Sequence, residues 1–323
     1  MRICIFGAGA MGGYMGAMLA RAGCDLSLVA RGAHLHAMKA NGLTLHVEGE
    51  SFTTHPRCSE RPEELGVQDA VLITLKMHSL DGALDQLRPL LGPETVVVTA
   101  QNGFPWWYFY GQPGPLENRH LDRVDPGGRL WRAIGPERVL GSVLWQAAEL
   151  TAPGVVTHGF GHRMTIGEPS GEISQRAKAV SATLEAAGIE APVLEDIRTD
   201  IWMKLWGNLC FNPLSVLTRQ CLGSLARESE SQRVARLMMA ESQEVAEALG
   251  IRFPITVDQR IARASELIGH PTSMLQDLQA DRPLELDGLL GAVIELGRLC
   301  GVTTPTLEVV YDLTQARAKH ARF

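Results

Sequence analysis

The sequence predicts an α/β protein with a doubly wound, mostly parallel sheet at the N-terminus and an all-helical domain at the C-terminus. Short, almost unbroken apolar runs alternate with helical patterns up to about residue 195, which is typical of a parallel sheet covered on both faces. No convincing strand pattern follows that point. The chain has 323 residues, too many for one comfortable core. We therefore expect a first domain at 1–195 and a second at 196–323.

The expected strands of the first domain are apolar runs rich in β-forming residues. They lie at 2–6, 24–31, 70–76 and 95–102, with a helix at 79–91 between the last two. Further strand patterns at 142–150, 154–160 and 163–169 are bounded by turns, and we expect them to pair antiparallel at one edge of the sheet. An amphipathic helix at 172–188 ends at Gly188.

The second domain contains only helical patterns. Pro213 falls just after the first of them, and a residue before proline avoids helical geometry, so we expect that helix to end or kink at Asn212. The predicted helices are 197–211, 228–249, 256–268, 273–280, 284–300 and 306–320.

Composition excludes several classes of function. The net charge is −6 and basic runs are absent, which argues against a nucleic-acid or anionic-membrane partner. The six cysteines and ten histidines show no metal-ligand spacing, so we expect no metal site and a reducing compartment. The glycine-rich start is a poor signal peptide, and apolar windows of about 18 residues are absent. We expect a cytoplasmic protein.

The first strand is followed by Gly7-Ala8-Gly9-Ala10-Met11-Gly12, a GxGxxG pattern. The pattern alone is weak, but a strand precedes it and a helix and a second strand follow it. In that context Gly7 makes a tight turn, Gly9 lets the backbone approach a pyrophosphate, and Gly12 lets helix and strand pack closely. The segment therefore predicts a Rossmann-type dinucleotide site. The alternative is a glycine-rich turn without a ligand.

The second strand ends at Arg31, where an acidic residue for a ribose hydroxyl is usual. A cation there can pair with a 2′-phosphate, so NADP is favoured over NAD. The alternative is a solvated arginine on a loop. Lys76 and Asn102 close two further strand patterns. Because ligands bind at the carboxyl ends of strands in such sheets, both are candidate cofactor or substrate contacts.

A row of polar residues crosses an otherwise apolar helix. Lys204, Asn208 and Asn212 follow one another at intervals of four in "IWMKLWGNLCFN", which displaces each by only about 40° around the helix. A partly buried amine can release a proton near neutrality, so Lys204 is a candidate proton donor to a carbonyl oxygen. The alternative is a lysine whose stem covers apolar surface, but the two amides favour a shared polar cleft.

A second polar cluster lies in "TSMLQDLQADRPLELDGLLG". Ser273 is expected to cap the helix that begins there, with Gln276 completing a capping box. Glu285 and Asp287 stand at the start of the next helix, where a favourable interaction with the helix dipole explains either acid.

Together these segments resemble the ketopantoate reductase (2-dehydropantoate 2-reductase) family almost from end to end. The segments that carry the resemblance occur in the family's order: "GAGAMG", Arg31, "LITLK", "QNG", "KLWGNLCFNPLSVLT", "SMLQDL" and "LELDGLLGAV". The pairing of K-x3-N-x3-NP with SMLQD and E-x-D is the specific part, since many dehydrogenases share the glycine loop.

The resemblance implies a Rossmann-type domain, a helical domain and a cleft between them. It implies that Lys204 is the general acid and that Glu285 is the carboxylate near it, engaging the substrate's hydroxyl. Asn208, Asn212 and Ser273 would hold the substrate, Asn102 would touch the nicotinamide end of the site, and Arg31 and Lys76 would favour NADPH. The implied reaction is reduction of 2-dehydropantoate to pantoate, a step toward pantothenate and coenzyme A.

Two departures from the family pattern affect the substrate. Leu290 replaces an asparagine that commonly follows the E-x-D motif, and the aromatic segment 104–137 is longer than in shorter members. That segment is expected to form a lid or wall of the cleft, or else a homodimer contact through its aromatic residues 106–110. The alternatives are reduction of another branched or aromatic 2-keto acid, an opine- or hydroxyacid-type dehydrogenase, and a non-catalytic NADP(H) sensor.

Overall fold

The computed structural model describes residues 1–267 and 269–320, and these form two compact units. What we call the sheet unit contains Met1–Gln101, Pro105–His120 and Gly128–Ile197. The helical unit contains Asn102–Phe104, Leu121–Gly127 and the described residues from Arg198 onward. Two short stretches of the N-terminal half, 102–104 and 121–127, therefore belong to the helical unit.

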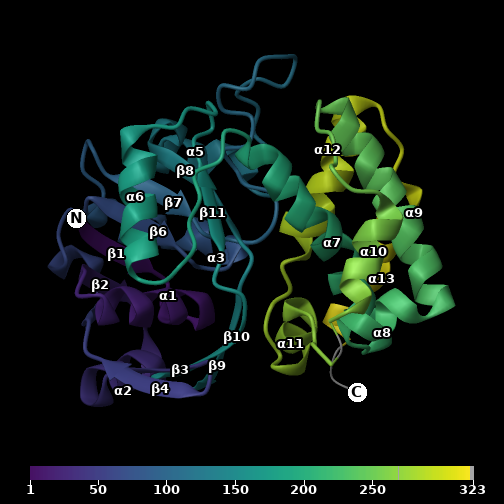
Figure 1. Cartoon of the computed structure of the whole chain (residues 1–323). Helices are drawn as coiled ribbons and strands as arrows, with labels where there is room; N and C mark the ends of the chain where they lie inside the picture. The colour runs from purple at the N-terminus through teal and green to yellow at the C-terminus, as the bar shows by residue number, and fades with distance from the viewer. Residues whose placement is uncertain (268, 321–323) are drawn as a thin grey trace. The chain divides into compact units, whose positions relative to one another are not determined.

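The sheet unit is built on a seven-stranded sheet (Figure 1). Its order, β11-β8-β7-β6-β1-β2-β5, is doubly wound, and all neighbours are parallel except β11 and β8. The chain moves outward from β1 through β2 to β5 and then returns to β6 on the other side of β1. The strands are β1 (Arg2–Phe6), β2 (Asp25–Val29), β5 (Arg57–Ser59), β6 (Ala70–Ile73), β7 (Val96–Thr99), β8 (Val139–Leu144) and β11 (Met164–Gly167).

The central strands are buried along their whole length because helices cover them. Every residue of β6, β7 and β8 is buried, as an unbroken apolar run in a parallel sheet requires. Helices α1 (Ala10–Arg21) and α6 (Gln175–Ala186) contribute to the same apolar core. The Ser174 hydroxyl caps α6 by accepting from the Ala177 N–H at 3.1 Å. The predicted strand at 2–6 is confirmed with the same bounds, and those at 24–31, 70–76 and 95–102 are confirmed with shorter ones.

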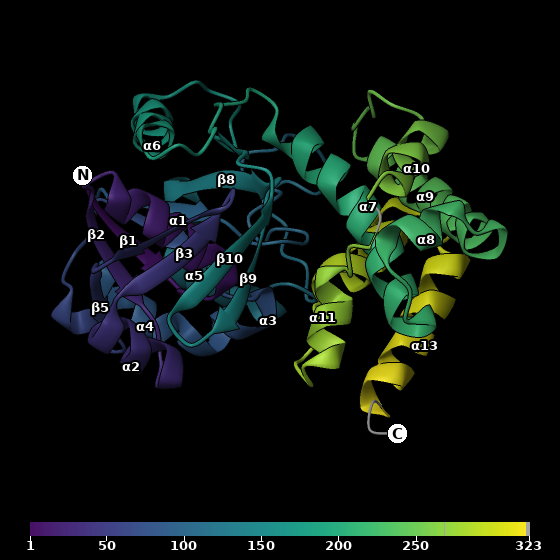
Figure 2. The same ribbon diagram turned by 60° about the horizontal axis from the view of Figure 1, so that its bottom comes forward.

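A second, four-stranded sheet was not predicted (Figure 2). The predicted strand at 142–150 is in fact two strands, β8 and β9, which separate after Leu144 and lie in different sheets. Antiparallel pairing at the sheet edge is confirmed for β11 with β8, whereas β10 pairs with β9 and β3 in the second sheet. Its strands are β3 (Leu43–Val47), β4 (Glu50–Thr54), β9 (Ala147–Ala152) and β10 (Val155–Phe160).

The remaining helices of the sheet unit are short. The predicted helix at 79–91 is broken, since Gly82 and Pro89 interrupt it and 3-10 turns link its pieces. The helices are α2 (Gly32–Asn41), α3 (Met77–Leu80), α4 (Leu84–Leu87) and α5 (Arg129–Ile134).

The helical unit is dominated by α7 (Ile197–Thr218), which runs through Pro213 without ending. The expectation that this helix ends at Asn212 is therefore wrong. Residues on both sides of the proline are buried, from Leu209 to Val216, so tertiary packing outweighs the missing N–H donor. The other helices are α8 (Leu222–Arg227), α9 (Ser229–Ala248), α10 (Val257–Ser265), α11 (Ser273–Gln279), a π-helix η6 (Asp287–Gly291), α12 (Ala292–Cys300) and α13 (Pro305–Lys319).

Helix α8 was not predicted. The helix predicted at 256–268 corresponds to α10, which ends at Ser265, and residue 268 lies outside the described part of the chain. Within residues 1–267 and 269–320, helices long and apolar enough to cross a membrane are absent.

Four consecutive aromatic residues of segment 104–137 belong to the core. Trp106, Trp107, Tyr108 and Phe109 are each at most 3% exposed, and the Trp107 indole N–H donates to the Thr99 hydroxyl at 2.9 Å. A homodimer contact through these four side chains is therefore wrong, because they present no surface to a partner. A run of large apolar residues is equally compatible with a buried core and an interface, so the sequence alone did not separate the two.

Replacing Trp107 by Ala should lower the free energy of unfolding by about 3–5 kcal/mol, since it leaves a large cavity and removes the indole hydrogen bond to the Thr99 hydroxyl. Urea denaturation followed by circular dichroism measures the change. Leu237, which is 52% exposed, provides the control, and Leu237→Ala should shift stability by less than about 0.5 kcal/mol. Equal effects of the two substitutions would contradict a core role for Trp107.

Candidate active site

The glycine-rich loop joins β1 to α1 at the edge where ligands bind in doubly wound sheets. The Ala8 N–H donates to the Val29 carbonyl at 2.9 Å, and the Thr74 hydroxyl donates to the Gly7 carbonyl at 2.6 Å. The loop after β1 is thus tied to the ends of both neighbouring strands, β2 and β6. Strand order reverses at β1, so the loop lies at the topological switch point.

The three glycines of the motif have distinct environments. Gly7 has φ +111°, and a Cβ there would lie 2.9 Å from the Leu75 backbone nitrogen. A Cβ on Gly12 would lie 2.4 Å from the Gly7 carbonyl oxygen. The fold itself therefore requires these two glycines. Gly9 has φ −76°, and an added Cβ would meet nothing within 4 Å, so the chain leaves open space beside the backbone at Gly9.

The N-terminus of α1 is suited to an anion. Gly9 is its N-cap, without a side-chain cap, and its first turn contains no acidic residue. The backbone N–H groups of a first turn have no partner within their own helix, and the helix dipole favours negative charge there. This end of α1 together with the open space at Gly9 fits a pyrophosphate.

Two predicted cofactor contacts stand at nearby loop positions. Arg31 is exposed and is the N-cap of α2, two residues after β2 ends at Val29. Lys76 is half-buried and is the N-cap of α3, three residues after β6 ends at Ile73. Both therefore follow the carboxyl ends of strands that flank β1, although each lies beyond the strand rather than closing it.

The predicted polar row lies on one continuous helix. Lys204 and Asn208 are half-buried on α7, and Asn212 is 6% exposed. The helix around them is apolar, with Trp202, Leu205, Trp206 and Leu209 each at most 2% exposed. The row is thus the polar stripe of a core helix.

Burial changes the acidity of the lysine. Burial and, to a smaller extent, the nearby Arg260 guanidinium together lower the pKa of Lys204 to about 8, while Asp200 opposes the shift. Desolvation penalises the charged amine, and a neighbouring cation repels it. The same ammonium can therefore hold or release its proton close to neutral pH.

Arg260 was missed from the sequence. Its guanidinium lies against α7 at Gly207, where a Cβ added to the glycine would overlap the Arg260 Nη2 atom. A glycine inside a helix costs about 1 kcal/mol relative to alanine, so Gly207 within the apolar run was the available signal of a close neighbour. The arginine itself, in "VDQRIARAS", carries no motif.

The cap of α11 differs from the prediction. Thr272 is the N-cap, and its hydroxyl accepts from the Leu275 N–H at 3.2 Å; Ser273 is the first helical residue and is exposed. A capping box on Ser273 is therefore wrong. Thr272 is also 2.5 Å from the Ser215 hydroxyl, which donates to the Asn212 carbonyl at 2.6 Å. This chain of hydroxyls connects the start of α11, where Ser273 lies, to the Asn212 turn of α7.

Glu285 and Asn102 are both linked to the π-helix η6, one through the chain and the other through a neighbouring hydrogen bond. Glu285 is half-buried, two residues before η6 begins at Asp287. Asn102 comes from the stretch 102–104, in which the Phe104 N–H donates to the Gly288 carbonyl of η6 at 2.8 Å and the Phe104 ring meets Trp202 edge-on. The six predicted catalytic and substrate residues therefore all belong to the helical unit: Asn102, Lys204, Asn208, Asn212, Ser273 and Glu285.

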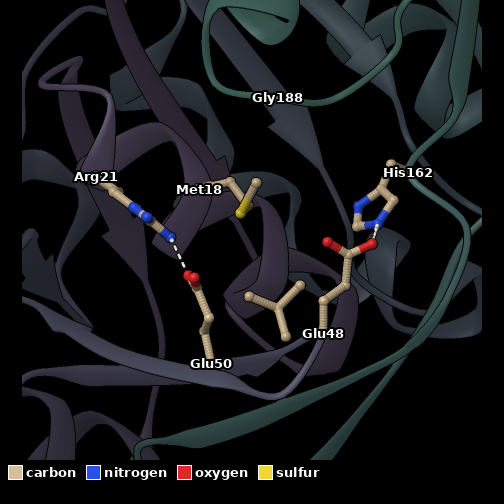
Figure 3. Close-up of a pocket in the computed structure, with 7 residues that line it drawn as sticks. Met18, Arg21, Glu48, Glu50, His162 and Gly188 are labelled. Atoms are coloured by element: carbon tan, nitrogen blue, oxygen red, sulfur yellow. Dashed lines mark hydrogen bonds and ion pairs between the residues drawn. The ribbon is translucent and has the colours of Figure 1, made fainter.

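A pocket in the sheet unit is lined by none of the predicted residues (Figure 3). Its polar side chains are paired with one another: His162 Nε2 is 2.9 Å from a Glu48 oxygen, and Arg21 is 3.7 Å from Glu50. These pairs leave it without a converging set of groups for a substrate. Across the described residues, clusters of three or more His, Cys, Asp or Glu side chains that could hold a metal are absent.

Comparison with known proteins covers both halves of the chain. The family described as "Ketopantoate reductase PanE/ApbA" matches residues 3–171, and its C-terminal counterpart matches residues 196–318. A 2-dehydropantoate 2-reductase of Mesorhizobium japonicum is 53% identical over 319 residues, which span 98% of each chain.

Solved structures agree in fold. A chain from Ralstonia solanacearum with a provisional ketopantoate reductase name is 39% identical, with a TM-score of 0.94 over 99% of this chain and 98% of that one. D-mandelate dehydrogenase, in a ternary structure with NADH and anilino(oxo)acetate, has a TM-score of 0.85 over 100% of both chains. Its identity is 22%, so this likeness concerns the fold alone. By the matches at 53% and 39% identity and the two family models, the chain belongs to the ketopantoate reductase family and is an oxidoreductase.

Proposed function

We propose that the protein reduces 2-dehydropantoate to pantoate with NADPH, and that Lys204 is the general acid. In this proposal residues 1–195 bind the dinucleotide, and residues 196–323 carry the catalytic and substrate-binding groups. The observation that carries it is the half-buried Lys204 on α7, whose pKa is lowered to about 8. The 53% identical 2-dehydropantoate 2-reductase of Mesorhizobium japonicum supports the choice of substrate.

The reaction requires one proton at the carbonyl oxygen. NADPH, when bound, would supply the hydride that reduces the C2 carbonyl, leaving the carbonyl electron pair on oxygen. The Lys204 ammonium donates a proton to that oxygen, forming the hydroxyl, and is left as a neutral amine. A pKa of about 8 makes this transfer favourable near neutral pH, because an effective acid has a pKa close to the working pH. An arginine would hold the charge but could not release the proton.

The other residues orient the substrate. In the proposal Glu285 engages the substrate's hydroxyl near Lys204, while Asn208, Asn212 and Ser273 hold its carboxylate and hydroxyl groups. Asn102 would meet the nicotinamide end of the site. The hydroxyl chain from Thr272 through Ser215 to the Asn212 carbonyl supports the pairing of Ser273 with Asn212, since it fixes the two elements that carry them.

The cofactor preference rests on Arg31 and Lys76. The α1 N-terminus with its open space at Gly9 would hold the pyrophosphate through backbone N–H groups Ala10 to Gly12. Arg31 after β2 would pair with the 2′-phosphate, and Lys76 would add positive charge after β6. These cations favour NADPH, although the D-mandelate dehydrogenase structures hold NADH.

One departure bears on the keto acid. Leu290, in place of the usual asparagine, is 0% exposed and packs in the core of the helical unit. This chain therefore lacks the side-chain amide that the asparagine would provide at that position. The runner-up is accordingly the same chemistry on another branched or aromatic 2-keto acid, which kcat/KM values across a keto-acid panel would distinguish.

Lys204→Ala should reduce kcat for 2-dehydropantoate by about 10²–10⁴-fold, the usual contribution of a positioned general acid. NADPH oxidation at 340 nm measures the rate, and Lys178→Ala, an exposed lysine on α6, is the control that should retain full activity. Near wild-type turnover of every 2-keto acid by the Lys204 variant would exclude the mechanism. Tight NADPH binding by a parent protein that reduces none of them would favour the non-catalytic sensor.

Arg31→Ala should weaken NADPH binding by about 10–100-fold, as expected for loss of one charge-assisted contact, and should leave NADH binding nearly unchanged. Isothermal titration with each nucleotide measures both. Arg88, whose side chain is 68% exposed in the same unit, is the control. A parallel loss for NADH and NADPH would show that Arg31 does not contact the 2′-phosphate.

A further inference from the structure

The π-helix η6 begins two residues after Glu285 and is held by a residue from a distant part of the sequence. Arg123 Nη1 donates to Asp287 Oδ1 at 2.8 Å, and the Tyr311 hydroxyl donates to the same oxygen at 2.7 Å. Arg123 Nη1 also lies 2.9 Å from the Tyr311 oxygen, so the three groups form a closed triangle. Asp287 is the first residue of η6.

Arg123 is itself fixed by its backbone. The Asp122 and Arg123 N–H groups donate to the two carboxylate oxygens of Glu295, at 2.9 and 3.0 Å. The neighbouring Leu121 and Val124 are 2% and 5% exposed. The stretch 121–127 is therefore anchored on α12, and its arginine approaches Asp287 from a defined position.

A glycine leaves room for the triangle. A Cβ on Gly291, the last residue of η6, would lie 2.9 Å from Asp287 Oδ1, 3.3 Å from Arg123 Cδ and 3.4 Å from a Tyr311 ring carbon. π-helical turns are rare and are frequently found at functional sites. Side-chain support from outside the helix can stabilise such a turn.

We propose that Arg123 is a positioning residue for Glu285, which it holds in place by fixing Asp287 at the start of η6. The inference rests on the proposed function, because it assumes that Glu285 acts on the substrate. The stretch 102–104, which carries Asn102, meets the same π-helix through the Phe104–Gly288 hydrogen bond. Two separate parts of the N-terminal half thus converge on the turn that follows Glu285.

The ion pair is not a strong source of stability. The Arg123 and Asp287 side chains are 43% and 55% exposed, and exposed pairs contribute little to folding. A small displacement at a reacting group can nevertheless change rates by about 10²-fold. Loss of Arg123 should therefore affect turnover far more than it affects thermal stability.

The test compares Arg123→Ala, Asp287→Ala, the double variant and Tyr311→Phe with the parent. Arg298→Ala is the matched control, because Arg298 also forms a 2.8 Å ion pair, with Glu308, in the same unit. Arg123→Ala should lower kcat for 2-dehydropantoate by about 10–100-fold with an unchanged KM for NADPH and a Tm shift no larger than the control's. The double variant should lose no more than the worse single variant, since the two residues act as one unit, and Tyr311→Phe should lose less.

Amide hydrogen exchange gives a readout independent of turnover. Exchange across residues 286–291 should accelerate in Arg123→Ala and stay at the parent rate in Arg298→Ala. If the parent reduces no 2-keto acid, the proposed function fails, while unaltered exchange would overturn the positioning role itself. Retention of kcat within about twofold in Arg123→Ala, or losses that multiply in the double variant, would also overturn it.

Discussion

The candidate site depends on one constraint, the burial of an ammonium group in an apolar helix beside a guanidinium. Helix α7 provides the apolar surroundings through Trp202, Leu205 and Trp206. Desolvation of the Lys204 amine and the positive charge of Arg260 together lower the pKa of the lysine to about 8. Gly207 makes room for the guanidinium. The cost of burying two cations close together has a direct chemical consequence, because it makes Lys204 an amine that can hold or release a proton near neutral pH, as the proposed mechanism requires.

The groups that would surround this donor come from distant parts of the sequence. Asn102 reaches the helical unit through the Phe104 contact with Gly288, and Arg123 reaches it through Glu295 and Asp287. Both belong to stretches that interrupt the sheet unit's sequence. The aromatic segment thus has two roles, since residues 106–109 fill the core of the sheet unit and residues 121–127 support the turn after Glu285.

Sequence reasoning located the parts of the fold with strong local signals. The buried parallel strands, the GxGxxG loop and the long helices were predictable because hydrophobic period and glycine spacing determine them locally. Strands β3, β4 and β5 were missed because they are short and partly polar. β3 and β4 pair with each other as a local hairpin, whereas the pairing of β3 with β10 and of β5 with β2 joins more distant residues. The uninterrupted passage of α7 through Pro213 was missed for a related reason, because burial on both sides of the proline outweighs its local preference.

The candidate site shows the same division. The row of Lys204, Asn208 and Asn212 on one helix was predictable from helical spacing, and the roles proposed for Glu285 and Ser273 come from the family resemblance. Arg260 and Arg123 carry no local signal, and their placement depends on tertiary structure.

The pH dependence of kcat/KM tests the central claim most directly. With 2-dehydropantoate and NADPH, kcat/KM should be constant at low pH and should fall above about pH 8, where Lys204 loses its proton. Pantoate oxidation should rise over the same range, because the neutral amine is then the base. Arg260→Gln should move both breaks to higher pH, since removal of the neighbouring cation raises the lysine pKa. A forward profile that stays flat to about pH 10, the range of an unperturbed lysine, or one that Arg260→Gln leaves unmoved, would contradict this account.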